Sequence, residues 1–391
     1  MKKFAIFLIS VLLLMVLLSG CMFLNKPDQT KPVNPSVNNM PTNGVRQLPT
    51  YFMNWWFDQL NNRQSGQMVK QDKKPSKLIA SNNDILNTQQ LLSEPVSVSL
   101  PSTYYDLRDG EYVPSVGYQG MVNDCWAYST VESLESAMLV QLGPSGISAD
   151  YPFINDSNNP QLSIQFVAYN NCDWNVSSYL PATGDYYITY QETNKDNGGN
   201  HFFSFYDMVV RGIPLSTDFP YHENATGTST LPYIEWDPTN SSWPQHLVRA
   251  SYTYIIPPAS WFYSKGYSYA DYIDTIKSAI VKYGAVAVDF EVYSDFEKDA
   301  NEPSGWVYSG PSNATDEGGH AVILIGWNDN WTYNGTDYGP VWILQNSWST
   351  YWGHNGYWRQ PMISESQYDN PQSIGNWQIE ANLEGMYVPI L

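Results

Sequence analysis

The chain has 391 residues, enough for one large domain or two, and 15% of them are aromatic, which is typical of a globular protein rather than a disordered one. Its 38 acidic and 19 basic residues give a formal net charge of −19, which argues against binding to nucleic acid or electrostatic docking on anionic lipid. The three cysteines, Cys21, Cys125 and Cys172, form no Cys-x-x-Cys motif or Cys/His cluster, so we predict no metal site and no cofactor.

An export signal is predicted at the N-terminus, over residues 1–21. Two lysines precede an apolar run over residues 4–18, which is short for a membrane span. The run leads into Leu-Ser-Gly-Cys, which resembles a bacterial lipoprotein box. The resemblance implies that Cys21 is lipidated and becomes the new N-terminus; an ordinary secretory signal is the alternative. A diacylglyceryl cysteine suffices for stable anchoring, so we expect an extracytoplasmic protein held on the cell membrane or outer membrane.

The residues that follow the export signal show no helical or strand period until about residue 50. Residues 22–49 carry Lys, Asn, Thr and scattered prolines without a helix or strand period, which predicts a flexible tether. Residues 51–63 can form a short amphipathic helix, and a polar stretch then runs to about Pro95. We interpret residues 50–99 either as an N-terminal extension or as a pro-region that covers a cleft.

The next element is a helix that begins with a cysteine. Cys125 stands where unpaired backbone N–H groups and the positive end of the helix dipole favour a thiolate, the nucleophilic form of the side chain. Taken alone, Cys125 also fits a small buried apolar residue, and the cysteine count leaves a disulfide with Cys172 open. Apolar residues then follow at intervals of four, three and four, which predicts one apolar face of a helix: Ala127, Val131, Leu134 and Met138. Glu132 and Glu135 fall on the opposite side.

Helices give way to strands further along the chain. Residues 202–212 and 272–283 have helical patterns that end at glycines, whereas residues 285–292 alternate apolar and other residues with the period of a strand. His320 stands at the head of an apolar run, and residues 341–348 form another strand that ends in Asn-Ser-Trp. This order predicts the α+β class.

Five short segments stand in an order that one enzyme family also has. They are Leu-Pro-Ser-Thr-Tyr-Tyr-Asp-Leu-Arg at 100–108, Cys-Trp-Ala-Tyr-Ser at 125–129, a Leu-Ser-x-Gln stretch at 162–174, Asn-Gly-Gly at 197–199 and Trp-Gly-His-Asn-Gly-Tyr at 352–357. Together with the histidine and Asn-Ser-Trp segments, they resemble the papain-like cysteine peptidases, peptidase family C1. The resemblance spans roughly residues 100–360. In the family, the segment like 162–174 is a helix that ends in a cysteine.

The resemblance implies an architecture. We expect a papain-like two-lobe fold, with a mainly helical N-terminal lobe, a β-barrel-like C-terminal lobe and the active site in the cleft between them. The peptidase domain would span residues 100–391. Residues 222–262, rich in Pro, Asn, Ser and Trp, would form an expanded surface insertion in it.

The resemblance also implies roles for individual residues. Cys125 would attack a carbonyl carbon, His320 would take the thiol proton and pass it to the leaving amine, and Asn346 would orient the imidazole. Gln119 would donate a side-chain N–H to the oxyanion hole. The residues expected at the substrate are Gly198, Gly199, Trp126 and Trp348, and Trp348 would also shield the contact between His320 and Asn346 from water.

Some positions depart from the family pattern. Asn123 and Asp124 replace the usual Gly and Ser or Ala; the Asp124 carboxylate can cap the helix, but near the sulfur it would oppose the thiolate. Gly319 stands where the family often has Asp. Val122 stands where the family has the disulfide partner of a cysteine like Cys172, which implies that Cys172 is a free buried thiol.

We therefore predict a membrane-anchored, extracytoplasmic, monomeric cysteine peptidase that hydrolyses peptides or proteins through a thioester, without binding nucleic acid. A first alternative is a surface binding or adhesion lipoprotein with weak or no catalysis, which the Asn123–Asp124 change would explain. A second is a cell-wall amidase or acyl transferase. The joint presence of Gln119, Cys125, His320 and Asn346 favours an enzyme, because binding alone needs none of them.

Overall fold

The computed structural model describes residues 44–64, 87–169, 172–176, 188–192, 198–221, 245–296, 303 and 305–391. All of these residues fall in one compact unit, Val37–Leu391. The predicted signal peptide with Cys21, most of the predicted tether and residues 222–244 of the expected insertion lie outside the described residues.

The helices expected from the sequence are present. α2 spans Thr50–Gln64, α4 spans Cys125–Gln141 and α7 spans His201–Val210. α9, Tyr269–Tyr283, begins with a capping box and ends at Gly284. The shorter helices are α5 Gly143–Asp150, α6 Ile164–Tyr169, α8 Ala259–Ser264 and α10 Glu365–Asp369, with 3-10 turns at Leu107–Gly110, Pro371–Ser373 and Ile379–Ala381.

Eight strands form the main sheet, in the order β1-β5-β10-β6-β7-β8-β9, with β2 paired to β7. Neighbouring strands are antiparallel, except that β1 and β5 are parallel. Their bounds are β1 Gln89–Leu91, β2 Tyr104–Asp106, β5 Tyr252–Ile256, β6 Val286–Tyr293, β7 Asp316–Tyr333, β8 Thr336–Gln345, β9 Tyr357–Pro361 and β10 Met386–Ile390.

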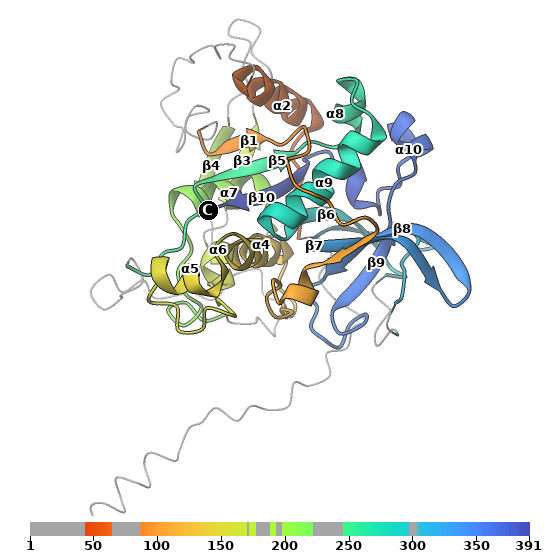
Figure 1. Ribbon diagram of the computed structural model, residues 1–391. Helices are drawn as coiled ribbons and strands as arrows, with labels where there is room; N and C mark the ends of the chain where they lie inside the picture. The colour runs from red at the N-terminus through yellow and green to blue at the C-terminus, as the bar shows by residue number, and fades with distance from the viewer. Residues whose placement is uncertain are drawn as a thin grey trace, which may run out of the picture. The chain divides into compact units, whose positions relative to one another are not determined.

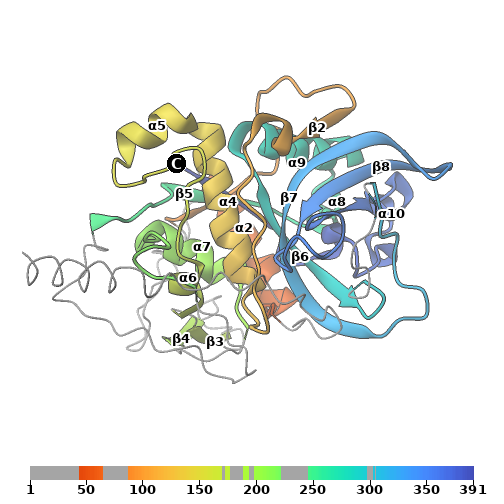
Figure 2. The ribbon, with the colours of Figure 1, turned by 90° about the horizontal axis from the view of Figure 1, so that it is seen from below.

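The α+β class and the separation of helices from strands are as expected. Figure 2 shows α4 to α7 on one side of the molecule and β6 to β8 on the other. The β part differs from the expected barrel, because the described strands form an open sheet that begins at β1 and ends at β9. In Figure 1, α2 lies beside β1, at the end of the sheet away from β8 and β9.

Two segments differ from what their sequence patterns suggested. The stretch at 162–174 is a helix only as far as Tyr169; Cys172 begins the strand β3, Cys172–Val176, which pairs with β4, Ile188–Glu192. The end of the expected surface insertion is part of the sheet: residues 252–256 form β5, which lies between β1 and β10. Its Tyr-Thr-Tyr-Ile-Ile sequence is rich in β-branched and aromatic residues, which favour a strand.

α4 is the central helix of the molecule. It contacts the strands β6, β7 and β10 and the helices α5, α6, α7 and α9. Its residues are buried all round from Cys125 to Leu139, so Glu132 and Glu135 are buried too. Glu135 keeps a partner there, because the backbone N–H of Leu162 donates to its carboxyl at 2.6 Å. A helix packed on every side holds Cys125 at a fixed position.

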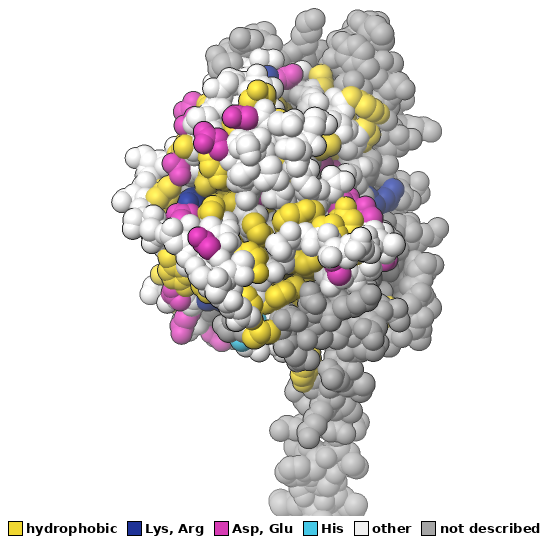
Figure 3. Space-filling model, turned by 90° about the vertical axis from the view of Figure 1, so that its right-hand side faces the viewer, with side chains coloured by type: hydrophobic (Ala, Val, Ile, Leu, Met, Phe, Trp, Pro, Cys, Tyr) yellow, Lys and Arg dark blue, Asp and Glu magenta, His cyan; other side chains and the backbone are white. Residues whose placement is uncertain are grey.

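The described surface reflects the acidic composition. In Figure 3, acidic side chains are scattered over the face that is turned to the viewer, and basic ones are few. Among the described residues, no helix has both the length and the apolar character needed to cross a membrane.

Candidate active site

Cys125 is the first residue of α4, and its side chain is completely buried. The thiol is free, so it forms no disulfide with Cys172. The backbone N–H of Ala321, on β7, donates to Sγ at 3.4 Å. This contact brings the start of the central helix against the strand that carries His320, 195 residues further along the chain.

His320 and Asn346 form a hydrogen-bonded pair. His320 Nε2–H donates to Asn346 Oδ1 at 2.8 Å, and the same oxygen accepts the backbone N–H of Ser347 at 2.8 Å. With Nε2 as donor, the neutral ring has its lone pair on Nδ1. Nδ1 is buried and makes no hydrogen bond with the described residues, so it is the ring atom available to accept a thiol proton.

Aromatic rings enclose this pair. The indole of Trp348 lies against the imidazole of His320, with ring centroids 4.6 Å apart and an angle of 31° between the planes. Phe290 meets the other side of His320 edge-on at 6.0 Å. Trp348 is fully buried and packs on Phe296 and Trp352. Burial lowers the pKa of His320 to about 4, although the hydrogen bond with Asn346 acts in the opposite direction.

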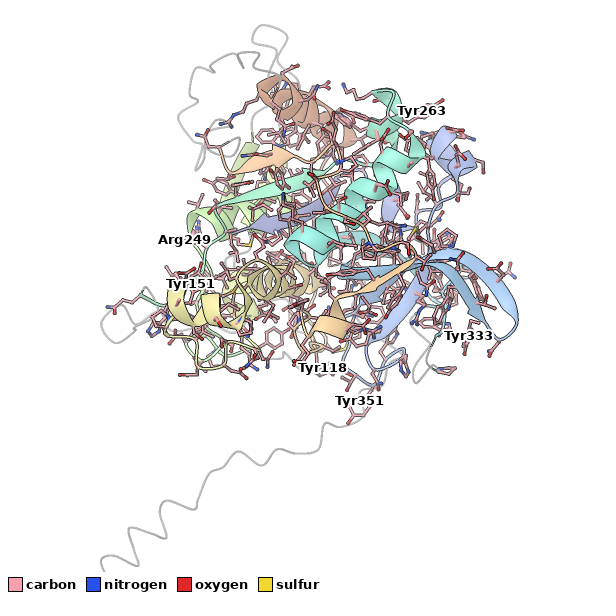
Figure 4. The ribbon with its side chains drawn as sticks, in the orientation of Figure 1. Tyr118, Tyr151, Arg249, Tyr263, Tyr333 and Tyr351 are labelled. Carbon is pink, nitrogen blue, oxygen red and sulfur yellow. The ribbon has the colours of Figure 1, made fainter. Side chains whose placement is uncertain are left out.

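Gln119 is fixed by three hydrogen bonds. Its Nε2 donates to the carbonyl of Val122 at 2.8 Å, its Oε1 accepts from the Ser347 hydroxyl at 2.6 Å, and its backbone N–H donates to the Ser347 carbonyl at 2.9 Å. The amide therefore has a set orientation, with a second N–H on Nε2. The adjoining Tyr118 lies at the lower edge of Figure 4 together with Tyr351, below α4.

Asp124 stands at the N-cap position of α4 but does not cap the helix with its side chain, in contrast to the expectation. Its Oδ2 accepts instead from the hydroxyl of Tyr221 at 2.8 Å, and its backbone carbonyl accepts from Ala127 N–H. Asp124 is 2% exposed. Burial raises the pKa of the Cys125 thiol to about 12; the Ala321 N–H lowers it, and the carboxylate of Asp124 raises it.

This arrangement predicts the effect of Asp124→Asn. The asparagine keeps an oxygen for Tyr221 but removes the negative charge, so the thiol pKa should fall. Because one pKa unit is a tenfold change in the thiolate fraction, the alkylation rate of Cys125 at fixed pH should rise by up to about tenfold. The measurement is the iodoacetamide rate as a function of pH. An unchanged rate would show that Asp124 has no electrostatic effect on the sulfur.

Residues 44–46, within the predicted tether, lie across this site, and we call them the occluding segment. Gly199 N–H donates to the Gly44 carbonyl at 2.8 Å, and Arg46 N–H donates to the Gly199 carbonyl at 2.8 Å, which makes a parallel bridge between Val45 and Gly199. On the other side, Val45 N–H donates to the Gly319 carbonyl at 3.2 Å. The segment thus bonds to Gly199, two residues before α7, on one side and to Gly319 of β7 on the other.

The fit of this segment depends on two glycines. A Cβ added at Gly44 would overlap Sγ of Cys125, and a Cβ added at Gly319 would lie 3.0 Å from the Cβ of Val45. The papain-like peptidases, which this sequence resembles, often have Asp at the position of Gly319. Because Gly319 has no side chain, Val45 can occupy the space beside it. The backbone at Gly44 covers the thiol directly, which contributes to the complete burial of Cys125.

The predicted substrate-binding residues lie around the same segment. Gly199 bonds to it through its backbone and lies against the indole of Trp126. Gly198, next to it, has a positive φ of 72°. Trp126 is 4% exposed, and its Nε1 donates to the Asn123 carbonyl at 3.2 Å. Trp348 lies on His320, as described above.

Sequence reasoning missed Asn200 and Glu384. Asn200 Oδ1 caps α7 by accepting Phe202 N–H at 2.7 Å, and its Nδ2 donates to the Arg46 carbonyl at 2.9 Å and also to Glu384. Glu384 in turn accepts the backbone N–H of Leu48. An asparagine directly before a helix is a capping signal, so Asn200 could have been found, whereas nothing near Glu384 in the sequence marks it.

A comparison with protein families gives one match. Residues 189–372 match the model of the family described as "Papain family cysteine protease". The match covers His320 and Asn346 and ends before β10; it begins after Gln119 and Cys125. No curated protein matches the chain.

Solved structures with a similar course of the chain were also found. They include "proCathepsin B S9 from Trypanosoma congolense", with 19% identity, coverage of 88% of this chain and 98% of that chain, and a TM-score of 0.48. The bromelain protease from Ananas comosus has 19% identity, coverage of 74% and 100%, and a TM-score of 0.43. The Amb a 11 cysteine protease of ragweed pollen, in its proform, has 16% identity, coverage of 88% and 90%, and a TM-score of 0.47.

Proposed function

We propose that this chain, which carries a papain-family C1 peptidase domain by its match over residues 189–372, is a cysteine peptidase that hydrolyses peptide bonds with Cys125, His320 and Asn346. The observation that carries the proposal is a pair of contacts made by neighbouring residues of β7. Ala321 N–H bonds to Sγ of Cys125, and the adjacent imidazole of His320 is held by Asn346 through Nε2. A chain that only binds a ligand needs neither contact.

The first half of the proposed reaction forms a thioester. The thiol proton of Cys125 passes to Nδ1 of His320, and the sulfur lone pair attacks the carbonyl carbon of the peptide bond. The carbonyl oxygen takes the negative charge of the tetrahedral intermediate. His320 then returns the proton to the amide nitrogen, the C–N bond breaks, and the amine product leaves. Asn346 keeps the ring in the tautomer and orientation that these steps require.

The second half releases the acid. A water molecule gives a proton to Nδ1 and attacks the thioester carbonyl, and the C–S bond breaks with return of the proton to sulfur. In both halves the second N–H of Gln119 Nε2 and the backbone N–H of Cys125 are the proposed donors to the oxyanion. The bonds of Gln119 to Val122 and Ser347 support this, because they fix the amide before substrate binds.

The described form would not bind substrate in this proposal. Residues 44–46 use both backbone groups of Gly199 and also bond to Gly319, and these are the groups that a peptide substrate would pair with beside the thiol. The chain would therefore be made in a self-occluded state, which is relieved when the segment moves away or is cut. We further propose that Cys21 is lipidated and holds a monomeric enzyme on the outer side of a membrane.

A thiol-directed peptidyl epoxide tests the proposed function. The full chain is incubated with the probe, the labelled residue is identified by mass spectrometry, and peptide cleavage is assayed from about pH 4 to 8. Because residues 44–46 cover the thiol, we expect modification of Cys125 in the chain with Gly44→Leu, which displaces them, and its loss when His320→Ala is added. If neither the unchanged chain nor a chain with residues 44–46 displaced were labelled or cleaved peptide, the peptidase proposal would be wrong, and the binding or adhesion alternative would be favoured.

A further inference from the structure

Residues 119–124, which we call the oxyanion loop, connect the two proposed donors to the oxyanion. The loop begins at Gln119, whose side chain is one donor, and ends at Asp124, directly before the other donor, the backbone N–H of Cys125. The amide of Gln119 is held by Ser347, which follows β8, whereas Cys125 belongs to α4. The distance between the two donors therefore depends on what ties the oxyanion loop to the helical part of the molecule.

One tyrosine contacts both ends of the oxyanion loop. The hydroxyl of Tyr221 lies 2.9 Å from the backbone carbonyl oxygen of Gln119 and 2.8 Å from Oδ2 of Asp124. A tyrosine hydroxyl has a single hydrogen, so the two acceptors share it in a three-centre hydrogen bond. Burial and the charge of Asp124 raise the pKa of Tyr221 well above its usual range, so the hydroxyl keeps this hydrogen at neutral pH.

Tyr221 is itself held against the helical part of the molecule. Two residues before it, the carbonyl of Phe219 accepts the hydroxyl of Ser163 at 2.7 Å, directly before α6. The ring of Phe219 meets Phe166 of α6 edge-on at 5.4 Å, and the ring of Tyr221 meets Tyr128 of α4 edge-on, also at 5.4 Å. The hydroxyl therefore reaches the oxyanion loop from a fixed position.

The sequence of the oxyanion loop explains why such a tie is needed. The loop contains no cysteine, and Val122 stands where the papain-like peptidases have one half of a disulfide. The described hydrogen bonds of Val122 stay within the loop, because its N–H and its carbonyl both pair with Gln119. These bonds shape the loop but do not join it to α6, whereas Tyr221, held beside α6, bonds to Asp124 at the end of the loop.

We propose that Tyr221 is a positioning residue whose hydroxyl fixes the oxyanion loop, so that the Gln119 amide and the Cys125 N–H converge on one oxygen. The inference rests on the proposed function and concerns how its transition state is stabilised. Tyr221 neither touches the substrate nor exchanges a proton in this role. Because a misplacement of 1 Å costs about 100-fold in rate, a loop that drifts loses much of the effect of its donors.

Tyr221→Phe tests this role, because it removes the hydroxyl and keeps the ring that packs on Tyr128. All measurements use the full chain with Gly44→Leu, in which the occluding segment is displaced. For a fluorogenic peptide we expect kcat to fall about 10- to 100-fold. KM should stay within about threefold, because the hydroxyl supports an interaction that is made only in the transition state.

Two active-site probes separate the oxyanion from the thiol. With a peptide aldehyde, Sγ of Cys125 bonds to the carbonyl carbon, the C=O electron pair moves to the oxygen, and His320 takes the thiol proton, so the oxygen lies where the oxyanion forms. A peptidyl epoxide is attacked at a saturated carbon, a C–O bond of its ring breaks, and no tetrahedral oxyanion forms. In Tyr221→Phe the aldehyde affinity should fall by the same factor as kcat. The epoxide labelling rate should stay within about threefold, because it depends on the thiolate.

Tyr368→Phe is the matched control for stability. Tyr368 is also a buried tyrosine whose hydroxyl donates to a backbone carbonyl, that of Tyr267 at 2.7 Å, but it lies on α10, which packs on α8 and α9. Its loss should lower the melting temperature about as much as Tyr221→Phe and leave kcat and the aldehyde affinity unchanged. If Tyr221→Phe does not fold, Asp124→Ala removes the acceptor instead and should lower the aldehyde affinity relative to the epoxide labelling rate.

The possible outcomes separate this role from the proposed function. If Tyr221→Phe kept the kcat and aldehyde affinity of Tyr368→Phe, the hydroxyl would only stabilise the fold, and the peptidase would stand. An equal fall for the aldehyde and the epoxide would place the effect at the thiol and also overturn the role. If the chain with Tyr221 intact neither hydrolysed peptide nor reacted with either probe, the proposed function would be wrong, and the role of Tyr221 with it.

Discussion

Replacing His320 with alanine is expected to lower kcat/KM for a peptide substrate by about 10²- to 10⁴-fold, the usual contribution of a positioned acid–base group. The reason is that Nδ1 is the buried ring atom left without a partner once Nε2 bonds to Asn346, and no other described histidine is on the strand that contacts the thiol. Hydrolysis of a fluorogenic peptide, normalised to folded protein, measures the effect in chains that also carry Gly44→Leu, so that residues 44–46 do not cover the thiol.

The control for this variant is another histidine of the same chain. His246 pairs with Asp218 at 3.1 Å and stacks on Phe153, so His246→Ala should leave kcat/KM unchanged. Asn346→Ala should give a smaller loss than His320→Ala, because it removes only the group that orients the ring. If His320→Ala were as active as the unchanged chain, the acid–base assignment would be wrong.

Replacing Gly44 with leucine is expected to expose the thiol. A Cβ at position 44 would overlap Sγ of Cys125, so either the sulfur or the segment must move, and the bulk of a leucine is expected to displace the segment. Once the segment leaves, water reaches the sulfur and the thiol pKa falls from the value of about 12 that burial causes. Each unit by which the thiol pKa falls increases the fraction of thiolate about tenfold, so the rate of Cys125 alkylation at pH 7 should increase at least about tenfold.

The pH dependence gives this prediction a second readout. A thiol with a raised pKa keeps gaining thiolate as the pH increases, so the alkylation rate of the unchanged chain should rise about tenfold per unit through the whole range of roughly pH 7 to 10. In Gly44→Leu the rate should level off at a lower pH. Gln47→Leu is the matched control, since residue 47 directly follows the occluding segment and is exposed. If both variants behaved like the unchanged chain, residues 44–46 would not control access to Cys125.

The helix and the strand that carry the candidate site were predictable, because each is marked by a short local pattern. Cys125 at the head of a helix and His320 at the head of an apolar strand could be located because helix and strand periods are visible within about ten residues. The position of Cys172 on a strand and the place of residues 252–256 in the sheet were missed, because a short apolar stretch fits either helix or strand and is settled by its partners in the fold.

The occluding segment could not be predicted for a different reason. Gly44, Val45 and Arg46 hold their place almost entirely through backbone groups, which every residue has, and their partners Gly199 and Gly319 lie more than 150 residues away in the sequence.

The contact between Val45 and Gly319 also limits how such a chain can change by mutation. An aspartate at position 319 would place its Cβ 3.0 Å from that of Val45, so Val45 would have to shift by a few tenths of an ångström, and a Cβ at position 44 would overlap the thiol sulfur. The two glycines and the covering segment therefore depend on one another, because a side chain at either position loosens the cover over Cys125. A chain that acquired a carboxylate next to its histidine would have a looser cover, and one that keeps the close cover keeps glycine at position 319.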